Sequence, residues 1–386
     1  MRRLRLLPLL GLAVVSLAAQ SEPFKVHNVK AVITHGPYLV DPSETAVTVV
    51  WTTDTPSHPA VKFGLGQVMD TMAEVSEHGL LPVGTRHTVR LTNLESGRTY
   101  SYQAVATRVV KLNAYWPEKG LPIESPVATF TTFDRRKPSV SFSVVTDTHE
   151  NVARIDALMK AIDWTTTDFL GHAGDAFDWL ENEDQLFTRW IDPINRGLTH
   201  SKPLVYARGN HEWRGPFARD LFPYLPIEDG RFYFMRDHGP IRLVVLDTGE
   251  DKPDDTNVYS RLNRSEPYLD AELRWLAAMS KSDPRFREAP FRVVLMHQPE
   301  WGSMPDGRAR WIATANEAGI DLVIAGHNHK FSRVEAGTNG AAFTTVVVGQ
   351  DQVARVDATA QEIRITTKTA SGEVVDTFVV PRRTGR

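Results

Sequence analysis

The chain has 386 residues, of which 41% are hydrophobic and 24% are charged, a composition typical of a soluble globular protein with more than one domain. Its formal net charge of −3 creates no global positive field, which argues against nucleic-acid binding as a function. The chain contains no cysteine, so disulfides and thiolate metal ligands are excluded. Any metal site must therefore use histidine, aspartate, glutamate or asparagine.

The N-terminus has the pattern of a secretory signal peptide. The basic segment MRRLR precedes the apolar run LLPLLGLAVVSLA, and residues 16–18 supply the small side chains of a cleavage site. This run is shorter than the ~20 apolar residues of a spanning helix and contains Pro8, which disfavours an uncleaved anchor. We therefore predict a signal peptide over residues 1–19 and export to the periplasm or the extracellular space, without a stable membrane anchor.

Residues 24–133 are expected to form an all-β region. The segments AVTVVWTTD (46–54), HTVRLTNL (87–94) and ESGRTYSYQAVA (95–106) are rich in β-branched and aromatic residues and are bounded by turn signals. Short strands over ~100 residues indicate a β-sandwich. These segments resemble a fibronectin type III-like module, which we expect to pack beside the next domain rather than to act as a separate binding unit.

A short charged linker, FDRRKP (133–138), precedes a region of different texture, residues 139–380. Apolar strands such as SVSFSVVTD (139–147) alternate with segments of helical spacing such as NVARIDALMKAID (151–163). This alternation predicts a layered α/β domain with a buried sheet. The C-terminal segments TTVVVG, QVARVDAT, EIRITTKT and EVVDTFVV have strand patterns, and we expect them to complete a second sheet.

Metal-binding residue types follow the ends of five predicted strands in this second region. Loops at the carboxyl ends of strands in an open α/β sheet converge on one crevice, and a cation would satisfy polar groups that are costly to bury. In AGHNHK, His327 and His329 would also face one side if the chain is extended there. The groups oversupply a single ion, so two ions ~3.5–4 Å apart fit better. The candidates that end these strands are Asp147, His149, Asp175, Asn210, His211, Glu212, His297, His327 and His329.

The ordered set D-x-H, GD, GNHE, H and GHxH resembles the calcineurin-like metallophosphoesterases. Together with the preceding fibronectin-like module, it is similar to the purple acid phosphatase branch of that superfamily. The resemblance implies a four-layer α/β/β/α domain with two metal ions and Asp175 as the bridge between them. It implies that the first ion is also bound by Asp147, His149 and His329. It implies that the second ion is also bound by Asn210, His297 and His327.

The resemblance also implies a mechanism. His211 would stabilise the transition state or protonate the leaving group. A hydroxide held by the metal ions would be the nucleophile, so that no covalent enzyme intermediate is required.

Two positions depart from the purple acid phosphatases. Those enzymes carry a tyrosine three residues after the bridging aspartate, where this chain has Asp178, and a glycine where it has His149. Both differences match ordinary metallophosphoesterases. We therefore expect a colourless centre of Fe, Mn or Zn ions, whose identity the sequence leaves open. Asp178 itself is either an acid near the metals or a helix cap or surface carboxylate.

Other residues near these motifs allow two interpretations each. Arg208 and Arg214 flank the GNHE motif and either bind phosphate oxygens or form structural salt bridges. His172 is expected to be a hydrogen-bonded core residue rather than a substrate contact. Trp213 and Trp301 either line the site or pack on neighbouring loops. The polar segment 247–261 is long enough to border an active site.

The predicted function is an exported enzyme that hydrolyses phosphate esters at a dinuclear metal centre. We expect phosphomonoesters as substrates, because the domain order is that of the purple acid phosphatases. One alternative is a phosphodiesterase acting on nucleotides or lipid head groups. Another is a non-catalytic, metal-stabilised binding protein, which the complete set of ligands disfavours. The sequence leaves the natural substrate, the pH optimum and the oligomeric state open.

Overall fold

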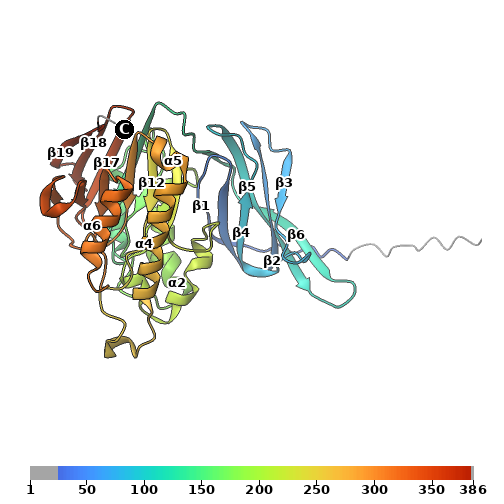
Figure 1. The fold of residues 1–386 in the computed structure, drawn as a ribbon. Helices are drawn as coiled ribbons and strands as arrows, with labels where there is room; N and C mark the ends of the chain where they lie inside the picture. The colour runs from blue at the N-terminus through green and yellow to red at the C-terminus, as the bar shows by residue number, and fades with distance from the viewer. Residues whose placement is uncertain (1–24, 384–386) are drawn as a thin grey trace, which may run out of the picture.

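The computed structural model describes residues 25–383, so the predicted signal peptide lies outside the described residues. Figure 1 shows two regions side by side, an all-strand region in blue to teal and a mixed region in green to red. No helix within residues 25–383 is long and apolar enough to cross a membrane.

The all-strand region is built around one long bent strand, β2. Its first half pairs mainly with β1 and β4, and its second half pairs with β3 and β5. The side chains of Trp51, Tyr102 and Phe130 are buried in the core between these strands, which is consistent with the predicted β-sandwich. The strands are β1 (Ile33–Val40), β2 (Val47–Leu65), β3 (Thr71–Glu74), β4 (Gly84–Leu91), β5 (Thr99–Lys111), β6 (Glu118–Glu124) and β7 (Ala128–Thr131).

The first sheet of the mixed region has a parallel centre and an antiparallel edge. β8, β9 and β10 run parallel, and β17 extends the sheet antiparallel to β8, followed by β18 and β19. The strands are β8 (Ser139–Val145), β9 (Leu170–His172), β10 (Leu204–Tyr206), β17 (Gln352–Thr359), β18 (Glu362–Thr369) and β19 (Val374–Pro381).

The second sheet consists of four parallel strands, β12, β13, β14 and β16, with antiparallel partners β11 and β15 at its edges. Its strands are β11 (Phe234–His238), β12 (Ile241–Val245), β13 (Phe291–Leu295), β14 (Leu322–Ala325), β15 (Ser332–Val334) and β16 (Thr344–Val347). The expectation that all C-terminal strands complete this sheet was wrong, because β17–β19 join the first sheet. The alternating apolar residues of β17, such as Ala354 and Val356, fill the core between the sheets from that side.

Helices cover the outer face of each sheet, which confirms the predicted four-layer α/β/β/α order. Ile155 of α1 and Ile194 of α3 pack on the first sheet. Leu276 of α4 and Trp311 of α6 pack on the second, and Figure 1 shows α4 and α6 lying side by side over it. The helices are α1 (Val152–Ala161), α2 (Glu183–Leu186), α3 (Asp192–Leu198), α4 (Ser265–Ser282), α5 (Pro284–Glu288) and α6 (Gly307–Ala318). The shorter turns are η1 (Phe187–Ile191), η2 (His211–Trp213), η3 (Pro216–Asp220), η4 (Phe222–Tyr224), η5 (Asn257–Tyr259) and η6 (Thr338–Gly340).

The two regions are joined directly. β1 pairs in parallel with β10 at Val40 and Leu204, so hydrogen bonding continues from the sandwich into the first sheet of the mixed region. The Tyr102 hydroxyl also donates to the carbonyl of His200 at 2.7 Å. The strands of the first region thus pack against the α/β layers, while a domain boundary at residues 133–138 stays a prediction.

Candidate metal centre

Both sheets direct the carboxyl ends of their parallel strands to one place. The loops that follow β8, β9, β10, β13 and β14 meet there, as the sequence pattern predicts for open α/β sheets. All seven predicted ligands lie in these loops and contact at least one other member of the set. They are Asp147, His149, Asp175, Asn210, His297, His327 and His329.

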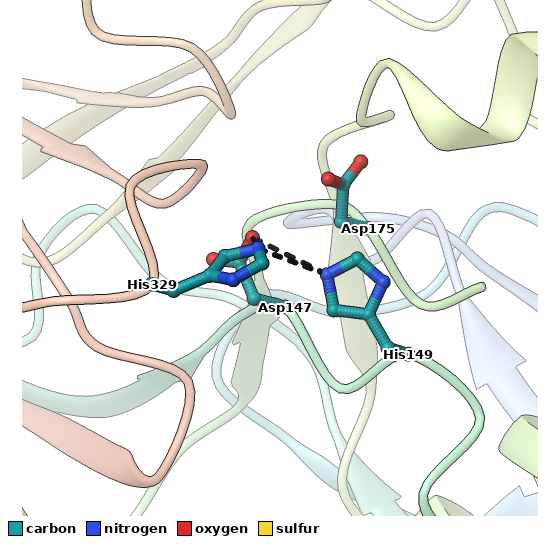
Figure 2. A group of neighbouring side chains, drawn as sticks. All are labelled: Asp147, His149, Asp175 and His329. Atoms are coloured by element: carbon teal, nitrogen blue, oxygen red, sulfur yellow. Dashed lines mark hydrogen bonds and ion pairs between the residues drawn. The ribbon is translucent and has the colours of Figure 1, made fainter. Parts of the chain in front are cut away.

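The first group of side chains surrounds the carboxylate of Asp147 (Figure 2). Its Oδ1 atom lies 3.3 Å from Nε2 of His329 and 3.9 Å from Nε2 of His149. The two Nε2 atoms are 3.1 Å apart. Together with Asp175, these residues can place four ligand atoms within 4.8 Å of one another, which is compact enough for one shared cation.

The second group shares Asp175 with the first. Oδ2 of Asp175 lies 3.0 Å from Nε2 of His297, and these two residues form a compact set with His327. Nδ1 of His327 lies 3.1 Å from Oδ1 of Asn210. Because Asp175 belongs to both groups, it occupies the position that a bridging carboxylate needs.

Buried polar atoms without partners show that this donor set fits cations. Oδ1 of Asp147 and Nε2 of His297 are buried and have no hydrogen-bond partner among the described residues. Nδ1 of His297 donates to the carbonyl of Ala173 at 2.7 Å, which leaves Nε2 as the ligand atom. Burial alone would lower the pKa of His297, but the adjacent Asp175 carboxylate outweighs burial and raises this pKa to about 10. A bound cation would take the place of that proton.

The backbone at the site adopts conformations that are uncommon for residues other than glycine. Five of the predicted ligands have φ between 43° and 74°, in the left-handed region that costs of order 1–3 kcal/mol per residue. They are Asp147, His149, Asp175, His327 and His329. The idea that the two histidines of AGHNHK converge on an extended strand was wrong, because β14 ends at Ala325 and both lie in the left-handed turn beyond it. Strain of this kind persists where function over-determines the local structure.

His211 stands beside the cluster and is held by backbone contacts. Its amide N–H donates to Oδ1 of Asp175 at 3.0 Å, and its Nδ1 donates to the carbonyl of Asp178 at 2.7 Å. The side chain of Asp178 places Oδ1 2.9 Å from Nδ1 of His149. Asp178 therefore lies near the centre and orients two histidines, the first of the two alternatives considered for it.

Arg214 contacts His211 rather than lying free at the rim. Its Nη1 atom donates to Nε2 of His211 at 2.9 Å. Its Nε and Nη2 atoms donate to the two carboxylate oxygens of Glu250, at 3.1 and 2.7 Å. The Glu250 side chain is fully buried and belongs to segment 247–261, so this segment does border the site as expected. Two-point attachment fixes the plane of the guanidinium in a way that lysine could not reproduce.

Arg208 has a structural environment instead. It donates to Asp247 at 2.7 Å, and its guanidinium lies 3.9 Å from the centroid of the Trp213 ring. These contacts account for the side chain and favour the salt-bridge interpretation over phosphate binding.

Two further candidates lie in the core. His172 is fully buried, with Nε2 3.3 Å from Oγ1 of Thr148 and its ring edge-on to Trp190. Burial lowers the pKa of His172 to about 3, which keeps it neutral. Trp301 is fully buried and stacks on Trp311 with centroids 5.0 Å apart, so it packs within the second region and does not line the site.

Glu212 is a site residue whose role the sequence did not reveal. Its Oε2 atom accepts from the amides of Gly209 at 2.8 Å and Asp175 at 3.1 Å, and its Oε1 atom accepts from Ala176 at 2.6 Å. The carboxylate thus ties the GNHE loop to the loop that carries the shared aspartate. The only signal in the sequence was its place in GNHE, because the three amides come from two separate loops.

Glu212→Gln should weaken metal binding, because an amide nitrogen would replace one of the two accepting oxygens and face a donor. We expect a 10- to 100-fold loss of metal affinity, about the range for groups that orient ligands, and a stability loss of about 1–3 kcal/mol. Titration with Mn²⁺ and urea unfolding would measure the two effects. Glu317→Gln, at an exposed surface pair with Lys281, is the matched control. Unchanged affinity in Glu212→Gln would contradict this role.

Glu250→Gln should leave the metals bound but reduce turnover, because it removes one charged partner of the guanidinium that contacts His211. We expect kcat/KM to fall by roughly tenfold, as for the loss of one charge-assisted hydrogen bond. Steady-state kinetics together with metal analysis would check this. A variant with normal kinetics would show that Arg214 does not depend on Glu250.

Comparison with known proteins supports the class of protein that this fold and site define. Residues 140–331 match the calcineurin-like phosphoesterase family, so this part of the chain is a calcineurin-like metallophosphoesterase domain, as its motifs predicted. The chain thus belongs with the metal-dependent phosphoric ester hydrolases.

More specific similarity extends over most of the chain. Human acid phosphatase type 7 is 22% identical over 329 residues, which cover 75% of this chain and 68% of that protein. An uncharacterized protein of Mycobacterium tuberculosis is 25% identical over 337 residues, and the chain spans 60% of its length. The structure of purple acid phosphatase PPD1 from yellow lupin seeds matches with a TM-score of 0.68 at 16% identity, over 90% of this chain and 74% of that one. The fold is therefore purple acid phosphatase-like and includes the N-terminal strands.

Proposed function

We propose that this protein is a phosphomonoesterase with a dinuclear metal centre. The observation that carries the proposal is the position of Asp175, whose carboxylate belongs to both groups of potential ligands. Asp147, His149 and His329 would hold one ion with it, and Asn210, His297 and His327 would hold the other. When bound, the ions supply charge neutralisation at the phosphoryl oxygens and activation of water as the nucleophile.

The residues of the chain itself would orient the substrate and handle the proton. His211 lies at the edge of the centre and can donate a proton or a hydrogen bond to the leaving oxygen. Arg214, fixed by Glu250, can place a positive charge beside the phosphoryl group. Asp178 keeps His149 and His211 in place through its side chain and its carbonyl.

The preference for monoesters can be tested with two chromogenic substrates, p-nitrophenyl phosphate and bis(p-nitrophenyl) phosphate. Purified protein would be reconstituted separately with Mn²⁺, Zn²⁺ and iron, and kcat/KM compared for the two esters. We expect the monoester to be the better substrate. Faster hydrolysis of the diester would replace the proposal with a phosphodiesterase, and no metal-dependent turnover of either would contradict it.

We also propose that the protein is exported and that residues 24–133 and 139–380 are separate folding units. The signal-peptide pattern of residues 1–19 supports export. The separate core around Trp51 supports the division into units. N-terminal sequencing of protein recovered from the periplasm or the medium would test export, and an intact Met1 on that protein would contradict cleavage.

A further inference from the structure

A second cavity lies beside the candidate metal centre, on the other side of the GNHE loop. It has a volume of about 320 Å³ and is lined largely by aromatic and polar side chains. Its walls come from η2, from the segment 218–232 and from the start of α4. The residues used below are Trp213, Phe222, Phe232, Asn263 and Tyr268.

Three polar atoms of this lining are buried and have no hydrogen-bond partner among the described residues. They are Nε1 of Trp213, Nδ2 of Asn263 and the hydroxyl of Tyr268. An indole or amide nitrogen can only donate, and a hydroxyl can donate as well. Buried donors without partners are costly, so they indicate a ligand with acceptor atoms.

The charge at the cavity favours the same kind of ligand. Arg219 and Arg264 line it, and neither forms an ion pair with another residue in the part of the chain that the structure describes. The carboxylate of Glu212, which also lines the cavity, is already engaged by three backbone amides. Donors and positive charge therefore outweigh acceptors, while the rings of Phe222 and Phe232, 5.2 Å apart, supply flat apolar surface.

The cavity and the metal centre share two segments of the chain. Glu212 lines the cavity and accepts from the amide of Asp175, so one side chain separates the cavity from the shared ligand. Trp213 lies two residues after His211 in the same turn. The loop that follows β12 contacts Arg214 through Glu250 and lines the cavity further on through Asn263. A phosphoryl group at the metal centre would therefore have its organic part within reach of the cavity.

We propose that this cavity is a substrate subsite that binds a planar aromatic group with hydrogen-bond acceptors on its edge, as in the base of a nucleotide. This inference rests on the proposed function, because the phosphoryl group of the same molecule would occupy the metal centre. It names the class of ester that the enzyme selects: one in which a planar, acceptor-bearing group is joined to the phosphate by a short linker.

Calorimetric binding of uridine and of its non-hydrolysable 5′-phosphonate analogue to the Mn²⁺-loaded full chain tests the subsite. Uridine should bind, and the phosphonate should bind at least tenfold more tightly because it spans both sites. In Asp175→Asn the uridine affinity should persist while the gain from the phosphonate disappears. Tyr268→Phe and Trp213→Phe should each weaken uridine binding about three- to tenfold through loss of one hydrogen bond. Tyr115→Phe, at an exposed position outside the cavity, is the matched control for the first of these.

The outcomes separate this inference from the proposed function. An enzyme that hydrolyses p-nitrophenyl phosphate but does not bind uridine would overturn the subsite and leave the phosphatase proposal standing. Uridine binding without any gain from the phosphonate would also overturn it, because the cavity would then be a separate site. Equal uridine affinity in the wild type, Tyr268→Phe and Trp213→Phe would place the nucleoside elsewhere and overturn the assignment to this cavity. Failure to hydrolyse any ester would overturn the proposed function and the subsite with it.

Discussion

Asp175→Asn is expected to remove both metal binding and measurable turnover. The carboxylate belongs to both ligand groups, so its loss should affect two ions at once rather than one. Asparagine has nearly the same shape but offers one neutral oxygen, which cannot offset the charge of two cations. His297, whose Nε2 lies 3.0 Å from Asp175, would lose its charged neighbour at the same time.

The measurement for this variant is metal content after dialysis, together with turnover of p-nitrophenyl phosphate. Asp156→Asn, at a surface ion pair with Arg196, is the control for a change of aspartate to asparagine outside the site. An unchanged metal content in Asp175→Asn, with activity near the wild type, would sink the assignment of Asp175 as the bridge.

His211→Ala is expected to leave the metals in place while lowering kcat by about 10²–10⁴-fold, the usual contribution of a general acid. His211 is the one histidine that we place beside the centre rather than among the ligands, so its removal should not empty the metal site. Its side chain contacts Asp178 and Arg214, which remain in the variant.

Kinetics and metal analysis on the same preparation would test this second variant. The substitution His78→Ala, at an exposed position in the sandwich, is the control for loss of an imidazole far from the site. A His211→Ala protein without metal would make His211 a ligand. One with wild-type kcat would remove it from the mechanism.

The sequence predicted the positions of the site because its pattern is local. A short apolar strand followed by a polar ligand is visible within a few residues, as in SVVTDTH and FLGHAGD, and strand ends in α/β sheets meet at one edge. The roles of Glu212 and Glu250 were not visible in this way. Their partners lie up to 37 residues away in the chain, and either carboxylate could equally have been a surface group.

The glycines of the motifs also gained a reason only from the structure. A Cβ atom on Gly209 would lie 2.3 Å from the amide nitrogen and from Oδ1 of Asp175. A Cβ atom on Gly326 would lie 2.0 Å from Oγ1 of Thr146 and 2.6 Å from Oδ2 of Asp147. The sequence indicated that these positions allow sharp turns, whereas the structure shows that a side chain would displace the carboxylates themselves.

The pairing of the C-terminal strands could not be predicted from their pattern. An alternating strand such as β17 fits either of two sheets that share one core, and its choice depends on the free edge of β8. The link from β1 to β10 has the same origin, since a strand near the N-terminus and one in the α/β region meet only in the folded chain.

Titration of the metal-free full chain with Mn²⁺, followed both by bound metal and by hydrolysis of p-nitrophenyl phosphate, tests the central claim most directly. The geometry predicts that turnover appears with metal and saturates at two ions per chain, and that the two ions are magnetically coupled through Asp175 when examined by electron paramagnetic resonance. Saturation at one ion, uncoupled ions, or hydrolysis that persists in the metal-free protein would contradict a dinuclear centre built around this carboxylate.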